Sequence, residues 1–405
     1  MLQKQKRSNP EPIISMPIVN RVADLQPDIQ AWRRDIHEHP ELLYEVHRTA
    51  AFVADRLREF GCDEVATGLG RTGVVGVIKG SKPPGKGDMK VIGLRADMDA
   101  LPIEEETNLP YASKTKGLMH ACGHDGHTAM LLGAARYLAE TRNFAGEAVV
   151  IFQPAEEGGA GAVAMINDGL MDRFGIEQVY GMHNGPGIPV GSFAIRPGPI
   201  MAGGDAVIIE IEGLGGHAAR PHKCIDPVLV GAQLITALQS IVSRSVDPLE
   251  SAVISMCEFH AGHARNVIPQ TAELKGTVRT LSAEVRKLVE RRVREVVAGV
   301  AQITGARINL EYNHGYPVTV NHAPQTDVAM RAAREIAGDA NVHEMPPLMA
   351  GEDFAYMLEQ RPGALIFCGN GDSAGLHHPA YNFNDEAIVF GTSYWIKLVE
   401  NTLAA

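Results

Sequence analysis

The chain lacks any hydrophobic run long enough to cross a membrane. A membrane-spanning helix needs about 18 consecutive apolar residues, and the apolar segments of this 405-residue sequence are all shorter. The first twenty residues, MLQKQKRSNPEPIISMPIVN, also lack the continuous apolar core and the small-residue cleavage site of a secretory signal. We therefore expect a loose N-terminal tail on a cytoplasmic protein that has no membrane partner.

An excess of basic residues is missing as well. Lysine and arginine together number 37, against 48 aspartates and glutamates, so the net charge is −11. No basic run stands out beyond the short KQKR near the start. Proteins that bind nucleic acid or anionic membranes usually concentrate positive charge. The sequence therefore predicts neither kind of partner, and we expect the negative charge simply to keep the protein in solution.

Cysteine pairs are also absent. The cysteines are odd in number and widely spaced, and no C-x-x-C motif occurs. This usage is typical of a reducing compartment rather than of a disulfide framework. We expect four of the cysteines to be small buried hydrophobic residues, whereas Cys122 stands among histidines. The five are Cys62, Cys122, Cys224, Cys257 and Cys368.

Short apolar segments that alternate with helical patterns predict an α/β domain, in which helices flank a mixed, mostly parallel sheet. Residues 25–60 and the residues from 126 onward have helical patterns. The loop SKPPGKGD joins the first two apolar segments and is typical of a β-hairpin. The apolar segments are TGVVGVIKG, MKVIGLRAD, EAVVIFQ, QVYGMHN and GALIFCGNG.

A different pattern runs from about residue 203 to 312. Its segments read strand, helix, strand, strand, helix, strand, which is the order of an α+β ferredoxin-like unit. The second helix, SAEVRKLVERRVREVVAGVAQITG, carries a single apolar stripe. The length of the chain itself predicts two or three domains at roughly 100–200 residues each. We expect a discontinuous first domain over residues 1–201 and 314–405, interrupted by a second domain over residues 202–313.

Polar residues follow the predicted strands at the points where these strands end. Asp97 and Asp99 close one segment, Glu156 and Glu157 follow another, and His183 ends a third. In open α/β sheets, the carboxyl ends of the strands border the crevice in which ligands bind. We therefore expect residues that are distant in the sequence to converge there.

A metal site is the first interpretation of this convergence. The stretch LMHACGHDGHTAMLLGAARYL places Cys122 and His124 just before an apolar helix. Cysteine, histidine and carboxylate are ligands that zinc and related transition metals accept. Taken singly, each histidine has an ordinary structural explanation, but several convergent candidates favour a metal. Only one of His377 and His378 is expected to face the site, because neighbouring side chains in extended backbone point in opposite directions.

The remaining polar residues of this stretch and the Glu156–Glu157 pair have more than one interpretation. His127 is expected to be structural, and Asp125 to cap the helix or to orient a ligand. One glutamate can bind metal while the other takes a proton from water, as a general base does. In isolation, such a pair would more often be a solvated acidic loop.

The chain contains a long, ordered set of motifs that runs from about residue 28 to the end. They are RRDIHEHPEL, GLRADMDALPIEE, HACGHDGHTAML, FQPAEEGGAGA, YGMHNGPG, GGHAARPH, NVIPQTAELKGTVRT, MAGEDFAYML and LHHPAYNFND. Together they resemble the aminoacylase/carboxypeptidase superfamily of metallopeptidases. More narrowly, they resemble the branch of hippurate hydrolases, N-acyl amino acid amidohydrolases and plant auxin-conjugate hydrolases.

The resemblance implies a two-metal hydrolase with a catalytic domain and an inserted satellite domain that mediates dimerisation. It implies two divalent metal ions per subunit, and Zn, Mn, Co and Ni all suit the ligand types. It also implies a homodimer, or a dimer of dimers. Glu156 would be the general base. The metal ligands would be Cys122, His124, Glu157, His183 and His377.

Further residue roles are implied by the resemblance. Asp97 falls on the aspartate of an H-x-D motif, in which Arg95 replaces the histidine, so Cys122 and His124 are expected to substitute for the missing ligand. His217 resembles a satellite histidine that reaches the active site of the partner subunit, although an ordinary turn is the alternative for its GGHAARPH loop. Asn266 resembles a contact of the substrate carboxylate. Cys224 stands where relatives usually have glycine, and we expect only a local effect.

The predicted activity is metal-dependent hydrolysis of the amide bond of N-acyl or N-aroyl amino acids, such as hippurate. A related metal-dependent dipeptidase or carboxypeptidase is the main alternative. A cysteine hydrolase with Cys122 as nucleophile and His124 as base is disfavoured, because residues two apart give awkward geometry. A non-catalytic metal-binding protein is disfavoured because a closed structural site has no use for the free Glu156.

Overall fold

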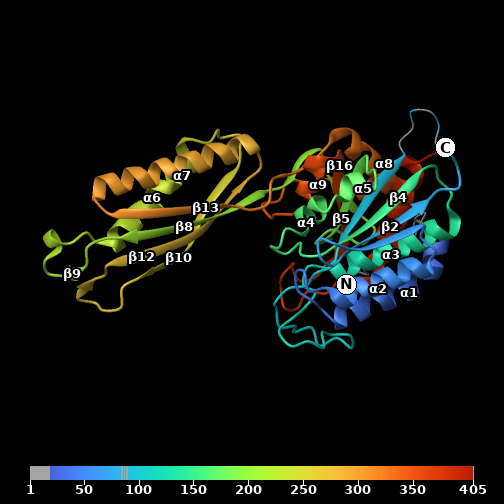
Figure 1. The fold of residues 1–405 in the computed structure, drawn as a ribbon, viewed down its shortest axis with the longest axis horizontal. Coiled ribbons are helices and arrows are strands. Elements are labelled where there is room, and N and C mark those ends of the chain that lie inside the picture. The colour runs from blue at the N-terminus through green and yellow to red at the C-terminus, as the bar shows by residue number, and fades with distance from the viewer. Residues whose placement is uncertain (1–18, 84, 86, 88–89, 405) are drawn as a thin grey trace, which may run out of the picture.

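The computed structural model describes residues 19–404, except residues 84, 86, 88 and 89. The expected loose tail at residues 1–18 lies outside the described residues. Two units lie side by side and are joined by a narrow connection (Figure 1). Within the described ranges, no helix combines the length and the apolar character needed to cross a membrane.

The larger unit is built on an eight-stranded mixed sheet, as predicted, with the order β1-β2-β4-β3-β5-β16-β6-β15. The four adjacent strands β4, β3, β5 and β16 run parallel to one another. Their residues are almost all buried, which explains the continuous apolar runs in the sequence. The strands are β1 (Glu64–Leu69), β2 (Gly73–Lys79), β3 (Val91–Asp97), β4 (Glu147–Gln153), β5 (Gln178–Pro186), β6 (Phe193–Ile195), β15 (Val342–Glu344) and β16 (Gly363–Gly371).

The expected hairpin between β2 and β3 is wrong. Strand β4 lies between them and pairs antiparallel with β2 and parallel with β3. The true hairpin joins β1 and β2 through the tight turn before Gly73. Turn-forming residues between two strands allow a hairpin but do not require one. The apolar interior of β4, residues 148–152, is fully buried, and it takes the position between β2 and β3.

Helices cover both faces of this sheet, and alternate strand residues face the two helical layers. Ile78 and Leu94 pack with one layer, whereas Val77 and Ile151 pack with the other. The expected helical region over residues 25–60 is two helices. The first layer contains α1 (Asn20–Glu38), α2 (His47–Glu59), α3 (His124–Thr141), α8 (Ala323–Ala337) and α10 (Ile388–Thr402), and the second contains α4 (Gly161–Asn167), α5 (Leu170–Arg173) and α9 (Ala355–Gln360).

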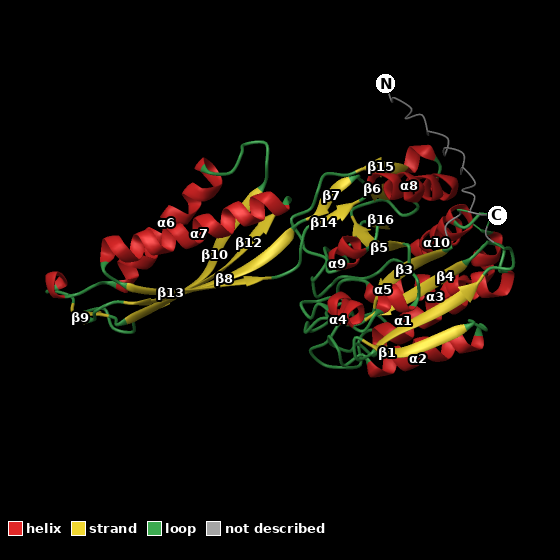
Figure 2. Cartoon of the chain, turned by 45° about the horizontal axis from the view of Figure 1, so that its top comes forward, coloured by secondary structure: helices red, strands yellow, loops and turns green. Residues whose placement is uncertain are grey.

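The smaller unit has the predicted β-α-β-β-α-β order. Its antiparallel sheet has the order β10-β12-β8-β13, and both helices cover one face (Figure 2). The apolar stripe of α7 is buried through Val285, Val289, Val293 and Val297. The elements are β8 (Gly203–Glu212), α6 (Pro227–Arg244), β10 (Ala252–Ala261), β12 (Thr271–Thr280), α7 (Ala283–Thr304) and β13 (Arg307–His314), with a small ribbon of β9 (Gly216–His217) and β11 (Val267–Ile268).

This smaller unit has a hydrophobic core of its own, separate from the two cores of the large sheet. We therefore keep residues 202–313 as the proposed extent of the inserted domain, although β13 continues to His314. Beside the connection, a two-stranded sheet of β7 (Gly198–Met201) and β14 (Thr319–Asn321) begins the return to the large unit.

Candidate active site

Four chain segments converge at one edge of the large sheet and bring five predicted site residues together. Glu156 and Glu157 follow β4, His183 lies in β5, and Cys122 lies just before α3. His377 comes from the loop after β16. All five line a cleft of about 580 Å³ that opens between the two units.

The predicted metal ligands lie within reach of one another. Three overlapping groups have all their ligand atoms within 4.8 Å, and Glu156 belongs to one of them. His377 is half-exposed, with its Nε2 3.2 Å from Glu157 Oε1, whereas Nδ1 of His378 accepts from the amide of Ala380. The groups are Cys122–His124–His183, Cys122–Glu157–His377 and His124–Glu156–Glu157.

The hydrogen bonds of the two buried histidines fit a metal site. Nδ1 of His124 lies 2.8 Å from the carbonyl of Asp99, and Nδ1 of His183 lies 2.7 Å from the carbonyl of Asn184. A carbonyl oxygen only accepts hydrogen bonds, so each Nδ1 carries the proton. The lone pair of each Nε2 is then available to a metal ion in the cluster. Within the described residues, Nε2 of His124 is buried and has no hydrogen-bond partner. Buried orphan atoms of this kind are what a bound cation would satisfy.

The electrostatics of the cluster favour positive charge at its centre. Burial lowers the pKa of His124, but Asp97 and Cys122 outweigh it and raise the pKa well above its usual value. Burial raises the pKa of Glu157, but His377 and His124 outweigh it, so this carboxylate stays ionised. A divalent cation would supply the positive charge that these groups attract.

The pKa of Glu156 is raised well above its usual value by burial and by the neighbouring carboxylates of Glu352 and Asp353. Its side chain sits beside the ligand cluster, and the residue is only 7% exposed. The increased proton affinity makes Glu156 a stronger proton acceptor than an ordinary carboxylate.

The turn before α3 depends on glycine. Gly123 has a φ of +92°, and a Cβ there would lie 2.3 Å from Nδ2 of Asn184 and 2.6 Å from the hydroxyl of Tyr381. These two side chains hydrogen-bond each other, and Asn184 also donates to the carbonyl of Cys122. The left-handed glycine thus lets Cys122 and His124 lie side by side at the start of the helix.

Asp97 lies behind the ligand cluster rather than in the cleft. One of its oxygens accepts from Nδ1 of His127 at 2.7 Å, and the other accepts from Arg95 at 2.8 Å. Nε2 of His127 accepts from the amide of Asn184 at 2.8 Å, so both ring nitrogens are hydrogen-bonded, which supports the expected structural role. Arg95 also contacts Asp353, so it holds together the buried charges beneath Glu156.

Asp99 is a site residue whose role sequence reasoning missed. Its carboxylate accepts from the main-chain amides of Glu156 at 2.9 Å and of Glu157 at 3.0 Å. It therefore fixes the direction in which both glutamates leave the turn. The only signal was its position two residues beyond Asp97 at the end of a strand.

His217 and Asn266 are not brought to this cluster within the chain. They lie together on the β9–β11 ribbon, where the amide of Ala218 donates to the carbonyl of Asn266. This ribbon forms the tip of the smaller unit farthest from the large sheet in both views (Figures 1 and 2).

The smaller unit contributes other residues to the cleft. Arg279 on β12 and Asn313 on β13 line it, facing the cluster from the opposite side. Arg279 packs against the backbone of Gly204, where a Cβ would lie 2.9 Å from its Nη1. Sequence reasoning missed Arg279, which appears in the GTVRT motif only as one residue of a strand.

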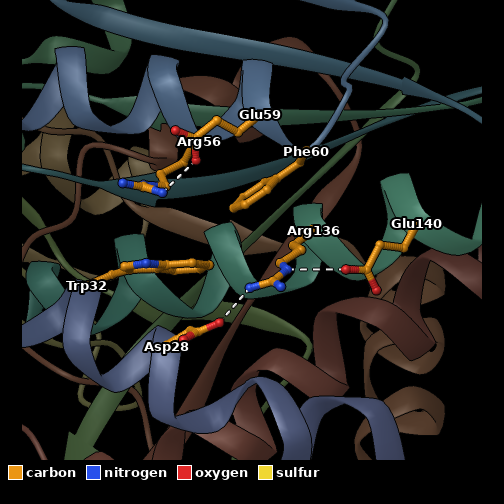
Figure 3. Close-up of a pocket in the computed structure, with 7 residues that line it drawn as sticks. All are labelled: Asp28, Trp32, Arg56, Glu59, Phe60, Arg136 and Glu140. Carbon is orange, nitrogen blue, oxygen red and sulfur yellow. Dashed lines mark hydrogen bonds and ion pairs between the residues drawn. The ribbon is translucent and has the colours of Figure 1, made fainter.

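A second depression, between α1, α2 and α3, has a different character. It encloses about 430 Å³, and its charged side chains pair with one another (Figure 3). Arg136 bonds to Asp28 at 2.8 Å and to Glu140 at 3.2 Å. Because these charges are already satisfied, we assign no chemistry to this depression.

The comparison with known proteins agrees with this geometry. Residues 93–401 match peptidase family M20/M25/M40. The chain belongs to this family. A hippurate hydrolase of Campylobacter jejuni is 46% identical, over 95% of this chain and 98% of that protein.

Other known proteins are nearly as similar to this chain. An N-acetyl-L-cysteine deacetylase of Bacillus subtilis is 44% identical, over 91% of this chain and 86% of its own length. A thermostable carboxypeptidase of Saccharolobus solfataricus is 42% identical, over 87% and 90%. The solved structure of the Bacillus subtilis YXEP protein, described as a dinuclear metal binding peptidase of this family, has a TM-score of 0.80 and 35% identity, covering 94% of this chain and 99% of that one. The chain is thus a hydrolase of this family with its α/β fold.

Proposed function

We propose that this hydrolase cleaves the amide bond of N-acyl or N-aroyl amino acids of the hippurate type, releasing a carboxylic acid and an amino acid. The observation that carries the proposal is the free carboxyl of Glu156 beside a cluster of metal-ligand atoms in an open cleft. The similarity to a hippurate hydrolase over nearly the whole chain supports the same substrate class.

The proposed ligands of two divalent metal ions are Cys122, His124, Glu157, His183 and His377. The ions, of which Zn, Mn, Co and Ni all suit these ligands, would act as Lewis acids toward water and the substrate carbonyl. Glu156 takes a proton from the attacking water and gives it to the leaving amine as the carbon–nitrogen bond breaks. Asp97 adds negative charge beside His124, with its oxygen 3.8 Å from Nε2.

The cleft offers two kinds of wall for such a substrate. Met201, Leu348 and Phe367 provide an apolar wall on the side of the large unit. Arg279 provides a cation on the side of the smaller unit. We assign the acyl group to the apolar wall and the amino-acid carboxylate to Arg279, because each then meets complementary chemistry.

The proposed assembly is a homodimer or a dimer of dimers, in which His217 and Asn266 of one subunit complete the site of the other. Their distant position at the exposed end of the inserted unit supports this assignment. The described cysteines are all unpaired, which supports the proposed cytoplasmic location.

The rival cysteine-hydrolase mechanism lacks support. Burial raises the pKa of Cys122 well above its usual value, which disfavours the thiolate that such a mechanism needs. The partner of its sulfur is His183, at 3.4 Å, and the other ring nitrogen of His183 donates only to a main-chain carbonyl.

A substrate panel tests the proposal. Benzoyl-, acetyl- and indoleacetyl-amino acids, together with unblocked dipeptides and N-blocked peptides, are assayed with each candidate metal ion. We expect the blocked amino acids to give the highest kcat/KM. If unblocked dipeptides or longer peptides are preferred at least about tenfold, equivalent to about 1.4 kcal/mol, the peptidase alternative replaces our proposal.

A further inference from the structure

Tyr316 lies in the segment that leads from the inserted unit back to the large unit. This segment, residues 315–318, runs beside the outgoing connection, and the amide of Gly204 donates to the carbonyl of Tyr316 at 3.0 Å. A Cβ at Gly315 would lie 2.4 Å from the carbonyl oxygen of Gly204. The two connections are therefore packed together as closely as their backbones allow.

The Tyr316 side chain reaches the turn that carries the catalytic glutamate. Its hydroxyl donates to the main-chain carbonyl of Glu156 and accepts from the amide of Ala160 at 3.3 Å. One hydroxyl thus bridges the two ends of the turn. Ala155 and Ala160 both have a φ of +55°, a conformation that costs free energy for residues other than glycine. The turn is therefore held from outside, and Tyr316 is one of the groups that hold it.

The connection that presents Tyr316 is itself fixed by the inserted unit. Arg286 of α7 donates to the carbonyl of Gly315 at 2.9 Å and forms an ion pair with Asp205 of β8. Asp205 also accepts from the amide of Gly315 at 3.2 Å and from the hydroxyl of Tyr312 at 3.0 Å. Hydrogen bonds therefore run without a break from α7, through the connection, to Glu156.

We propose that Tyr316 is a positioning residue that sets the orientation of Glu156 and links it to the placement of the inserted unit. The proposal rests on the role of Glu156 as general base. The hydrogen bond to the main-chain carbonyl of Glu156 fixes the orientation of that peptide plane and therefore the direction of the Glu156 side chain. A small displacement of a reacting group can lower the rate of the chemical step substantially. Arg279 packs against Gly204, whose amide donates to the carbonyl of Tyr316, so a substrate contact at Arg279 would act on the connection that presents Tyr316.

The test compares two conservative variants. Tyr316→Phe removes only the hydroxyl that contacts the Glu156 turn. Tyr356→Phe is the matched control, because its hydroxyl donates to the carbonyl of Gly315 in the same connection at 3.3 Å but does not contact that turn. We expect kcat to fall about tenfold in Tyr316→Phe, part of the roughly 10²–10⁴-fold contribution of a general base. KM, metal content and Tm should match those of Tyr356→Phe, which should retain wild-type kcat.

A double-mutant cycle separates positioning from general weakening of the structure. In a Glu156→Gln background, Tyr316→Phe should cause no further loss, because no base remains to be positioned.

The proposal is overturned if Tyr316→Phe keeps wild-type kcat, if both phenylalanine variants lose kcat equally, or if the loss persists unchanged in the Glu156→Gln background. Full activity of Glu156→Gln alone would instead overturn the proposed function. The two failures are therefore distinguishable.

Discussion

The Sγ atom of Cys122 lies 3.4 Å from Nε2 of His183, although 61 residues separate them in the chain. The first residue precedes a helix, and the second lies in a central strand. Their proximity defines the floor of the cleft, and the activity predicted here depends on what these two atoms bind.

Metal removal should abolish the activity. Exhaustive chelation is expected to eliminate hydrolysis of N-acyl amino acids, and one of Zn, Mn, Co or Ni should restore it. Because ligand binding stabilises the folded state by mass action, the metal-loaded protein should also have a higher Tm. Activity measured beside elemental analysis checks this. Full turnover in a verified metal-free preparation would refute the mechanism.

Substitution of the two adjacent glutamates should impair different properties of the enzyme. Glu156→Gln is expected to keep its metal and to lose at least about 10²-fold in kcat, as loss of a general base requires. Glu157→Gln should lose metal affinity first. Metal titration and kinetics on both variants distinguish these outcomes, and the reverse pattern would exchange the two roles.

Asp99 should matter through the backbone it holds. In Asp99→Asn, one of the two acceptor oxygens for the amides of Glu156 and Glu157 becomes a donor. We expect a lower kcat and a loss of about 1–3 kcal/mol in the free energy of unfolding. Asp63→Asn is the control, because its exposed carboxylate accepts from the amide of Lys79 far from the cleft. Equal kinetic effects of the two substitutions would contradict the assignment.

The buried His37 should make stability depend on pH. Burial lowers its pKa, but Asp125 and Glu105 outweigh burial and the nearby Arg33, and they raise the pKa to about 9. Because the folded state binds this proton more tightly than the unfolded state, the full stabilisation is present at pH values below the pKa of histidine in the unfolded chain, about 6.5. That contribution is lost as the pH rises through about 9. Denaturant unfolding between pH 6 and 9 should show a steeper loss for the wild type than for His37→Gln, and parallel curves would count against this account.

Subunit exchange tests the placement of His217. His217→Ala and Glu156→Gln homodimers should each be nearly inactive. We propose that His217 stabilises the oxyanion that forms on the substrate carbonyl, and such a donor is worth about 10²–10³ in kcat. Mixed dimers should regain activity, because one of their sites combines an intact Glu156 with an intact His217 of the other subunit. Verified exchange without recovery would show that His217 acts within its own chain or not at all.

The sequence predicted those parts of the molecule that depend on local pattern. Continuous apolar runs located the buried strands, and the β-α-β-β-α-β order of the smaller unit followed from alternation and helical periodicity. Pairing was harder to predict, because the loop between β2 and β3 has turn chemistry but nothing that specifies β4 as the neighbour. The convergence of cysteine, histidine and glutamate could be predicted because these residues follow or end strands whose carboxyl ends share one edge of the sheet.

Contacts made through the backbone or between units could not be predicted in this way. Asp99 acts by accepting hydrogen bonds from main-chain amides. The residue types in the Glu156 turn do not indicate such a partner. Arg279 faces the cleft only because the inserted unit is oriented as it is, and that orientation depends on packing at Gly204 and Gly315. Such features require the relative placement of distant segments.

The inserted unit begins and ends at almost the same point. Asp205 on β8 pairs directly with His314 on β13, so more than a hundred residues leave and rejoin the host chain as neighbouring strands. A flexible segment of that length would impose an entropic cost of loop closure on the large unit. Because the inserted unit is folded and its ends are adjacent, it imposes only the cost of a short loop. A tight two-strand turn in its place should leave the eight-stranded sheet able to fold, while removing every contribution that the insert makes to the cleft.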